Sequence, residues 1–210
     1  MKTWQFGGAT LAICLAGLLD ARAQSCPASA TLSAPFEVST LYTASGYMGD
    51  GRVKNKFVRM KPVSGEKPRP GASGSVHYKV TYQPGGPDGW AGVLWQFPPD
   101  NWGDKPGQAV RSASKITFWA AGEKGGEIVE FKAGGNFDRK CKDSFVAGTG
   151  NVALTKEWKQ YEIDLQGRDL SSVLDAFGWV ATVNANPDGL AFYLDSIRYE
   201  GSRSNTPRSK

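Results

Sequence analysis

Hydrophobic and polar residues alternate along most of the chain, which is typical of strands with one buried face. In Val76–Tyr82, Val and Tyr alternate with His, Lys and Thr, and Ala91–Phe97 alternates in the same way. The same period predicts further strands at Lys115–Ala121, Glu127–Ala133, Asp143–Val146, Trp158–Leu165, Phe177–Asn184 and Leu190–Glu200. A helical period occurs only in Asp169–Ala176, where it predicts one or two turns of helix.

Turn-forming sequences separate these runs, including Pro84–Pro87, Gly122–Gly126 and Asn186–Gly189. Closely spaced strands without intervening helices are typical of antiparallel β-sandwiches and jelly rolls. The composition agrees, because 26 Gly and 11% aromatic residues suit short strands joined by many turns. We therefore predict an all-β, antiparallel β-sandwich (jelly roll) with a single domain.

Residues 1–23 have the pattern of a secretory signal peptide: a basic start at Lys2, an apolar stretch Phe6–Leu19, and small residues at Ala21 and Ala23. The apolar stretch is shorter than the roughly 20 residues of a membrane-spanning helix, and no later stretch of the sequence qualifies. An alternative, lipidation at Cys26, has a poor match in the residues before it. We expect a secreted or periplasmic protein.

After cleavage, the sequence predicts three parts. An N-terminal segment covers 24–35, the β-sandwich covers 36–200, and a basic tail at 201–210 has no apolar anchor and is expected to be disordered.

Two of the three cysteines lie outside the signal peptide. An even pair in an oxidising compartment predicts a disulfide between Cys26 and Cys141, with two free thiols as the alternative.

Charge and histidine content exclude some classes of function. The single His77 rules out a centre with several histidine ligands and weakens any Ser-His-Asp mechanism. Basic residues gather in 49–74, where they could attract an anionic polymer, or could simply form a solvated strand edge and loop. Export argues against nucleic acid as the partner and leaves an acidic glycan as an alternative.

One strand carries two carboxylates with the spacing seen in some retaining glycosidases. Glu162 and Asp164 would share a face, but Gln166 stands where such enzymes need a general acid. The alternation instead predicts that both carboxylates face water, so we expect no catalysis.

Trp side chains dominate the segment 88–103. Exposed indole rings can stack on sugar rings, and nearby amides can bond hydroxyl groups. The candidate carbohydrate-binding residues are Trp90, Trp95, Gln96, Asn101 and Trp102. Trp90 and Trp95 have burial in the core as an alternative, whereas Trp102 lies in a turn-rich loop and is the favoured platform.

Several motifs together carry a family resemblance: Gly46–Asp50, Gly89–Gln96 with Asn101–Gly103, Thr117–Ala120, Trp158–Leu165 and Phe192–Ile197. Over about residues 36–200 the chain resembles the carbohydrate-binding-module-like, galactose-binding-like β-jelly-roll domains of secreted bacterial proteins. The resemblance implies a non-catalytic module that binds a polysaccharide or oligosaccharide.

The resemblance also implies a structural calcium ion near the first and last strands. Its expected ligands are Asp195 with Glu37 or Asp50. The sequence departs from the family where Ser196 replaces a second Asp, and an Asp195 bonded to backbone amides without metal is the alternative.

We therefore expect a monomeric, secreted protein that recognises a glycan without cleaving it. Two alternatives remain at this point: a sandwich-fold glycosidase or lyase, and an envelope protein that uses the domain for protein contacts.

Overall fold

In the computed structural model, residues 26–53, 55–72 and 77–201 are described. The predicted signal peptide and residues 202–210 of the predicted tail lie outside these ranges. Nearly all of the regular structure in the described chain is strand, which confirms the predicted all-β class. None of the helices in these ranges has the length and apolar character needed to cross a bilayer.

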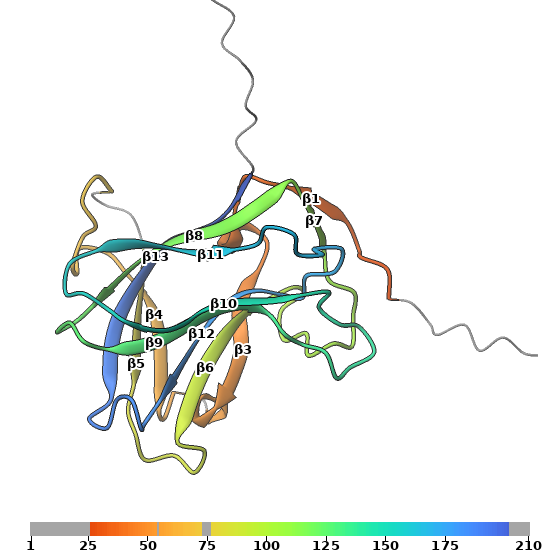
Figure 1. The fold of residues 1–210 in the computed structure, drawn as a ribbon. Helices are drawn as coiled ribbons and strands as arrows, with labels where there is room; N and C mark the ends of the chain where they lie inside the picture. The colour runs from red at the N-terminus through yellow and green to blue at the C-terminus, as the bar shows by residue number, and fades with distance from the viewer. Residues whose placement is uncertain (1–25, 54, 73–76, 202–210) are drawn as a thin grey trace, which may run out of the picture.

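Two sheets pack face to face as an antiparallel β-sandwich of the jelly-roll type (Figure 1). The first, called the β6 sheet, has the order β10 (Val146–Ala153), β9 (Ile128–Gly134), β12 (Asp175–Thr182), β6 (Trp90–Gln96) and β3 (Thr43–Gly49). The second, called the β13 sheet, has the order β11 (Lys159–Asp164), β8 (Ala113–Gly122), β13 (Leu190–Gly201), β5 (His77–Tyr82) and β4 (Val58–Val63). The short strand β2 (Phe36–Glu37) also pairs with β13.

The last two strands of the described chain occupy the middle of the two sheets. β12 pairs with β9 on one side and β6 on the other, and β13 pairs with β8 and β5. Each sheet is therefore completed by a strand that comes late in the sequence.

The N-terminal segment is attached to the sandwich. Its strand β1 (Thr31–Ser33) pairs in parallel with β7 (Ala109–Arg111), and the backbone N of Ser29 donates to the carbonyl of Gly107 at 2.8 Å. The predicted disulfide between Cys26 and Cys141 is confirmed, with the two Cα atoms 5.2 Å apart. The described part of 24–35 thus belongs to the folded unit.

Aromatic side chains join the two sheets across the core. Trp179 of β12 meets Phe192 of β13 with ring centroids 5.5 Å apart, and Phe131 of β9 meets Phe118 of β8 at 4.6 Å. All four rings are fully buried. Because alternate side chains of each strand point into the core, the remaining side chains lie on the outer faces of the two sheets, where they can contact solvent or a ligand.

Most strands predicted from alternation are present, with two errors. The segment Asp169–Ala176 is not helical: Leu170 and Val173 reach the core from an irregular segment, and β12 already begins at Asp175. The strand predicted at Asp143–Val146 is wrong as well, since β10 only begins at Val146. Two 3-10 turns are present, η1 (Val38–Thr40) and η2 (Asp50–Arg52).

Candidate functional site

The outer face of the β6 sheet has an apolar strip along its central strands. Two glycines, Gly92 and Gly178, sit in its central strands, and side chains from neighbouring positions lie over them. A Cβ atom on Gly92 would lie 3.0 Å from the Cε of Met48 and 3.1 Å from a methyl of Val180, and one on Gly178 would lie 2.6 Å from the Cδ2 of Leu94. The missing side chains therefore let apolar groups lie flat on this face.

At one end of this strip lies a hollow of about 340 Å³. Two exposed aromatic rings border it: Trp102, 37% exposed, and Phe137, 42% exposed. Its polar lining comes from Lys132, Asn136, Asp138, Arg139 and Asp175. A few directional polar groups beside apolar walls are the usual composition of a small-ligand site.

A single side chain closes the loop that presents Trp102. The amide nitrogen of Asn101 donates to the carbonyls of Phe97 and Lys105, both at 2.9 Å. Its Oδ1 accepts from the backbone N of Gly103, Asp104 and Lys105 at 3.1–3.2 Å. Because every polar atom of this side chain is used inside the loop, Asn101 positions Trp102 and is not free to bind a sugar.

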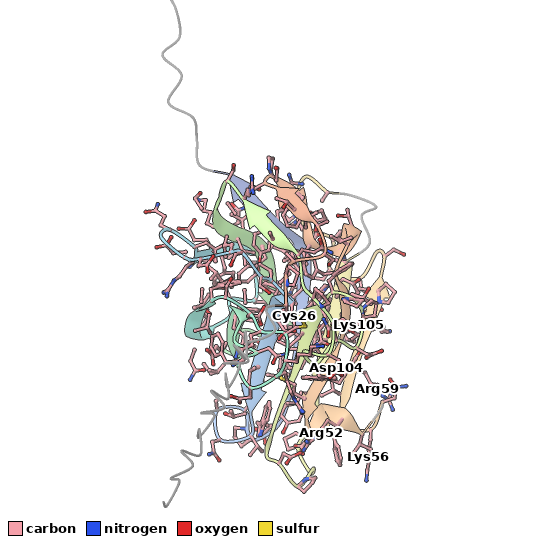
Figure 2. The ribbon with its side chains drawn as sticks, turned by 90° about the vertical axis from the view of Figure 1, so that its right-hand side faces the viewer. Cys26, Arg52, Lys56, Arg59, Asp104 and Lys105 are labelled. Atoms are coloured by element: carbon pink, nitrogen blue, oxygen red, sulfur yellow. A yellow bond between two sulfur atoms is a disulfide. The ribbon has the colours of Figure 1, made fainter. Side chains whose placement is uncertain are left out.

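The Trp102 loop is pressed against the segment that carries Phe137. Gly103 has φ +101°, and a Cβ there would overlap the Cβ of Arg139 and lie 2.7 Å from the carbonyl oxygen of Cys141. The N of Cys141 donates to the carbonyl of Gly103 at 2.9 Å. Gly103 therefore allows the two loops to touch. Figure 2 shows Asp104 and Lys105 of this loop, with Cys26, on the face turned toward the viewer.

A buried chain of polar groups runs beneath the hollow. The Nε2 of Gln96 donates to the carbonyl of Asn101 at 3.1 Å and to the Oδ1 of Asp175 at 3.0 Å. Asp143 accepts from the backbone N of Leu174, Asp175 and Asn136, which ties the Phe137 loop to β12. The two loops that border the hollow are thus held by one connected network.

The two carboxyl groups of this network titrate at unusually high pH. Desolvation is the main cause for both, and the negative charge of Asp143 adds to it at Asp175. Together these effects raise the pKa of Asp175 to about 7 and that of Asp143 to about 6, although Gln96 and Lys132 oppose the shift at Asp175. Near neutral pH the pair holds a proton that isolated carboxyl groups would have lost.

Of the residues predicted from the sequence to bind carbohydrate, Trp102 is the one that borders the hollow. The prediction for Trp95 is wrong, because its ring is fully buried in the core, where it meets Phe177 at 5.4 Å. Gln96 is fully buried too, so its amide supports the loops from below. Trp90 is half-buried at the opposite end of β6, about 20 Å along the strand from Gln96, so it does not share a platform with Trp102.

Sequence reasoning missed Phe137, Asp175, Lys132 and Met48. Phe137 follows the Gly134–Gly135 turn, so an aromatic ring in a glycine-rich loop was a usable signal. The others have no local signal, because they reach the hollow only when β3, β9 and β12 pair with their neighbours.

The residues predicted to bind calcium are divided between two places. Glu37, at the end of β2, and Asp195, in the middle of β13, line one hollow, whereas Asp50 lies elsewhere and accepts from the Tyr82 hydroxyl at 2.8 Å. Asp195 is paired with the Nε of Arg69 at 2.6 Å, and Glu37 lies 3.7 Å from Arg198.

This arrangement does not fit a calcium site well, because Asp195, the expected central ligand, already has a close guanidinium partner in Arg69 that compensates its charge. No set of three or more His, Cys, Asp and Glu side chains surrounds a possible metal position within the described ranges.

The paired carboxylates of β11 face water, as predicted. Glu162 forms an exposed ion pair with Lys115 at 2.7 Å, and the Oδ1 of Asp164 accepts from the N of Gln166. Tyr161 and Ile163 contribute to the core from the opposite face. Both carboxylates are therefore engaged with neighbours on an exposed face, which is the solvated arrangement that the alternation predicts.

Comparison with known proteins gives structural relatives only. No protein-family model matches the sequence, and no curated protein matches it. The family 11 carbohydrate-binding module of the cellulosomal cellulase Lic26A-Cel5E of Clostridium thermocellum is 17% identical, with a TM-score of 0.49, over 81% of this chain and 96% of that chain.

Two further solved structures are similar in the same way. The family 30 carbohydrate-binding module of the cellulosomal cellulase Cel9D-Cel44B of Clostridium thermocellum is 16% identical, with a TM-score of 0.47, over 81% of this chain and 95% of that chain. TmCBM61, solved with β-1,4-galactotriose, is 13% identical, with a TM-score of 0.43, over 79% and 94%. At these values the comparison assigns no ligand to this chain, but the modules found are of the kind that its sequence motifs resemble.

Proposed function

We propose that the protein binds a carbohydrate, without cleaving it, in the hollow between Trp102 and Phe137 on the outer face of the β6 sheet. One observation carries the proposal: two exposed aromatic rings from separate loops border one hollow at one end of an apolar strip. Large apolar rings in water are unfavourable unless something covers them, and the faces of sugar rings suit flat aromatic surfaces.

Rigidity of the rim supports the proposal. Asn101, Gln96 and Asp143 hold the two loops by buried hydrogen bonds, and the disulfide fixes Cys141 beside Gly103. A binding surface that is already ordered loses little conformational entropy when the ligand arrives.

The polar lining supports a ligand rich in hydroxyl groups. Lys132 and Arg139 can donate hydrogen bonds, Asp138 can accept them, and Asn136 can do both. Such mixed donors and acceptors suit sugar hydroxyls, which also donate and accept. We further propose that the protein acts outside the cytoplasm, because the signal-peptide pattern and the disulfide both suit an oxidising compartment.

The test is binding of the purified, disulfide-bonded protein to an array of neutral and acidic oligosaccharides, with affinity electrophoresis in the polysaccharides that respond. Trp102→Ala and Phe137→Ala should each weaken retention about fivefold to tenfold and leave the melting temperature nearly unchanged. Val53→Ala is the matched control, since Val53 is an exposed apolar side chain that does not line the hollow.

Two results would contradict the proposal. Full retention by both aromatic variants would place the binding surface elsewhere. Release of reducing sugars from the same polysaccharides by the purified protein would make it an enzyme.

A further inference from the structure

A second hollow lies on the other sheet, at the edge formed by β4 and β5, and has a volume of about 590 Å³. Four basic side chains line it, Lys56, Arg59, Lys61 and Lys79, together with Phe57, Thr81 and Gln83. No carboxylate is among the described residues that line it. Four other hollows of the described surface are each lined by at least one Asp or Glu.

Strand register places these charges close together on one face. Arg59 lies opposite Thr81, and Lys61 lies opposite Lys79. Residues two apart on a strand point to the same side, about 7 Å from one another, and directly opposite residues have Cβ atoms about 5 Å apart. Like charges directly opposite are unfavourable, so this arrangement calls for a compensating anion.

The protein supplies only part of that compensation. Lys79 has two acidic neighbours, Glu66 at 3.1 Å and Glu123 at 3.7 Å from its Nζ. Lys61 has only Glu66, at 3.8 Å, and both side chains of that pair are largely exposed. Exposed pairs of this kind contribute little. Lys79 is more firmly held, because hydrogen bonds to Tyr193 and Glu66 raise its pKa and keep it charged.

Two cations of the hollow stay without an acidic partner in the described chain. Neither Lys56 nor Arg59 forms an ion pair there; the Nε of Arg59 meets only the carbonyl of Asn55, at 3.4 Å. Figure 2 shows both side chains projecting away from the ribbon on the β4 side. Beside them the half-buried ring of Phe57, with the Nζ of Lys56 4.8 Å from its centroid, offers an apolar wall.

We propose that this hollow is a second glycan site, which binds anionic polysaccharide, and that it works independently of the hollow at Trp102. Carboxylate or sulfate groups spaced along an extended chain would meet Arg59 and Lys61 on β4, while a sugar ring lies against Phe57. The site combines fixed positive charge with one apolar surface, so its binding is electrostatic and weakens as salt rises.

The experiment uses the whole disulfide-bonded protein with two polyanions, polygalacturonate and dextran sulfate, at low and high NaCl. The double substitution Arg59→Ala with Lys61→Ala should weaken binding about tenfold at low salt. The control removes the same charge near the opposite edge of the same sheet, with Lys159→Ala on β11 and Lys156→Ala in the loop before it; both of these lysines are exposed. That control and Trp102→Ala should bind polyanions like the parent protein.

Binding to either polyanion with this pattern supports the proposal and identifies carboxylate or sulfate as the preferred group. Absence of binding to both would overturn it, and so would equal loss in the two double variants, which would reduce the effect to net charge. Neutral-glycan binding at Trp102 is measured separately, so failure of one site is distinguishable from failure of the other.

Discussion

The Nε2 of Gln96 lies 3.0 Å from the Oδ1 of Asp175, and this buried contact connects the two loops that border the hollow on the β6 sheet. The same nitrogen donates to the carbonyl of Asn101 in the Trp102 loop, while Asp143, beside Asp175, holds the Phe137 loop. Buried polar groups are costly unless they are satisfied, so such a network fixes a single geometry. The exposed rings therefore depend on residues that no ligand would touch.

The buried carboxyl pair makes stability depend on pH. Because burial raises the pKa of Asp175 and Asp143, the folded state keeps protons that the unfolded chain loses at about pH 4. The free energy of unfolding should therefore fall as pH rises from about 4 to about 7. Asp175→Asn should flatten this fall and raise the melting temperature at about pH 8 by at least 2–4 °C.

Calorimetry across that pH range checks this expectation. The control is Asp164→Asn, at an exposed position on β11, which should follow the parent profile. A parent protein whose melting temperature rises steadily between pH 4 and 7 would contradict the assignment.

Gly103 should tolerate no side chain. In Gly103→Ala the new methyl group would meet Arg139 and the carbonyl of Cys141, at a backbone φ that L-residues disfavour. We expect a loss of about 1–3 kcal/mol together with weaker glycan retention. The matched control is Gly150→Ala, which has φ +63° but nothing within 4 Å of the added carbon. Equal melting temperatures for the two variants would mean that the loops do not touch.

Trp95 and Trp102 should show opposite behaviour when truncated. Trp95→Ala removes a fully buried ring from the core and should lower stability by about 3–5 kcal/mol, while any folded fraction keeps its affinity for glycan. Trp102→Ala should lower retention with little change in melting. Chemical denaturation and affinity electrophoresis on the same samples separate the two effects. A Trp95→Ala protein as stable as the parent would show that Trp95 does not belong to the core.

Loss of the Arg69 side chain should lower stability more than removal of metal ions by a chelator. Arg69 is paired with Asp195 and lies over the Trp119 ring, with its Cζ 5.0 Å from the ring centroid. Arg69→Met leaves a buried carboxylate unpaired and should cost about 3–5 kcal/mol, partly recovered when Asp195→Asn is added. A chelator should leave the parent melting temperature unchanged; a clear drop on chelation, reversed by calcium, would restore the calcium prediction.

The disulfide should stabilise the whole sandwich. Its cysteines are 115 residues apart, and the chain-entropy model gives at most about 4–5 kcal/mol for a loop of this length. The double variant, Cys26→Ser with Cys141→Ser, should therefore melt at a lower temperature than the parent. The hydrogen bonds of the N-terminal segment should not compensate for the lost disulfide. Intact mass after alkylation without reductant checks the bond directly, since two alkylated thiols would dismiss it.

Strands with strong alternation could be predicted from the sequence, and weakly patterned ones could not. β5, β6 and β13 alternate β-branched or aromatic residues with polar ones, whereas β3 is built largely from small residues and β4 contains Pro62. The false helix arose because Leu170 and Val173 are spaced as on a helical face. Tertiary contacts hold them instead: the N of Val110 donates to the carbonyl of Leu170, and Val173 bridges to Gln108.

The candidate site was only partly visible in the sequence for a related reason. Trp102 could be predicted because it is an aromatic residue in a polar loop, and Phe137 has the same kind of sequence context. Asp175 did not, since its burial beneath the hollow depends on the pairing of β12 with β6, whose partners are about 80 residues apart in the chain. Contacts between segments that are distant in the sequence leave no local sequence pattern from which they could be predicted.

The central position of β12 and β13 has a consequence for how the chain is made. Among the strands made before these two, the sandwich contains only separate pairs: β1 with β7, β3 with β6, β9 with β10, β4 with β5, and β8 with β11. Two-stranded pairs are marginally stable in water, so folding should wait until residues 175–201 have been synthesised. A chain that folds only after its last strands have been made remains unfolded for longer. An unfolded chain can pass through a narrow translocation channel, which a folded sandwich cannot.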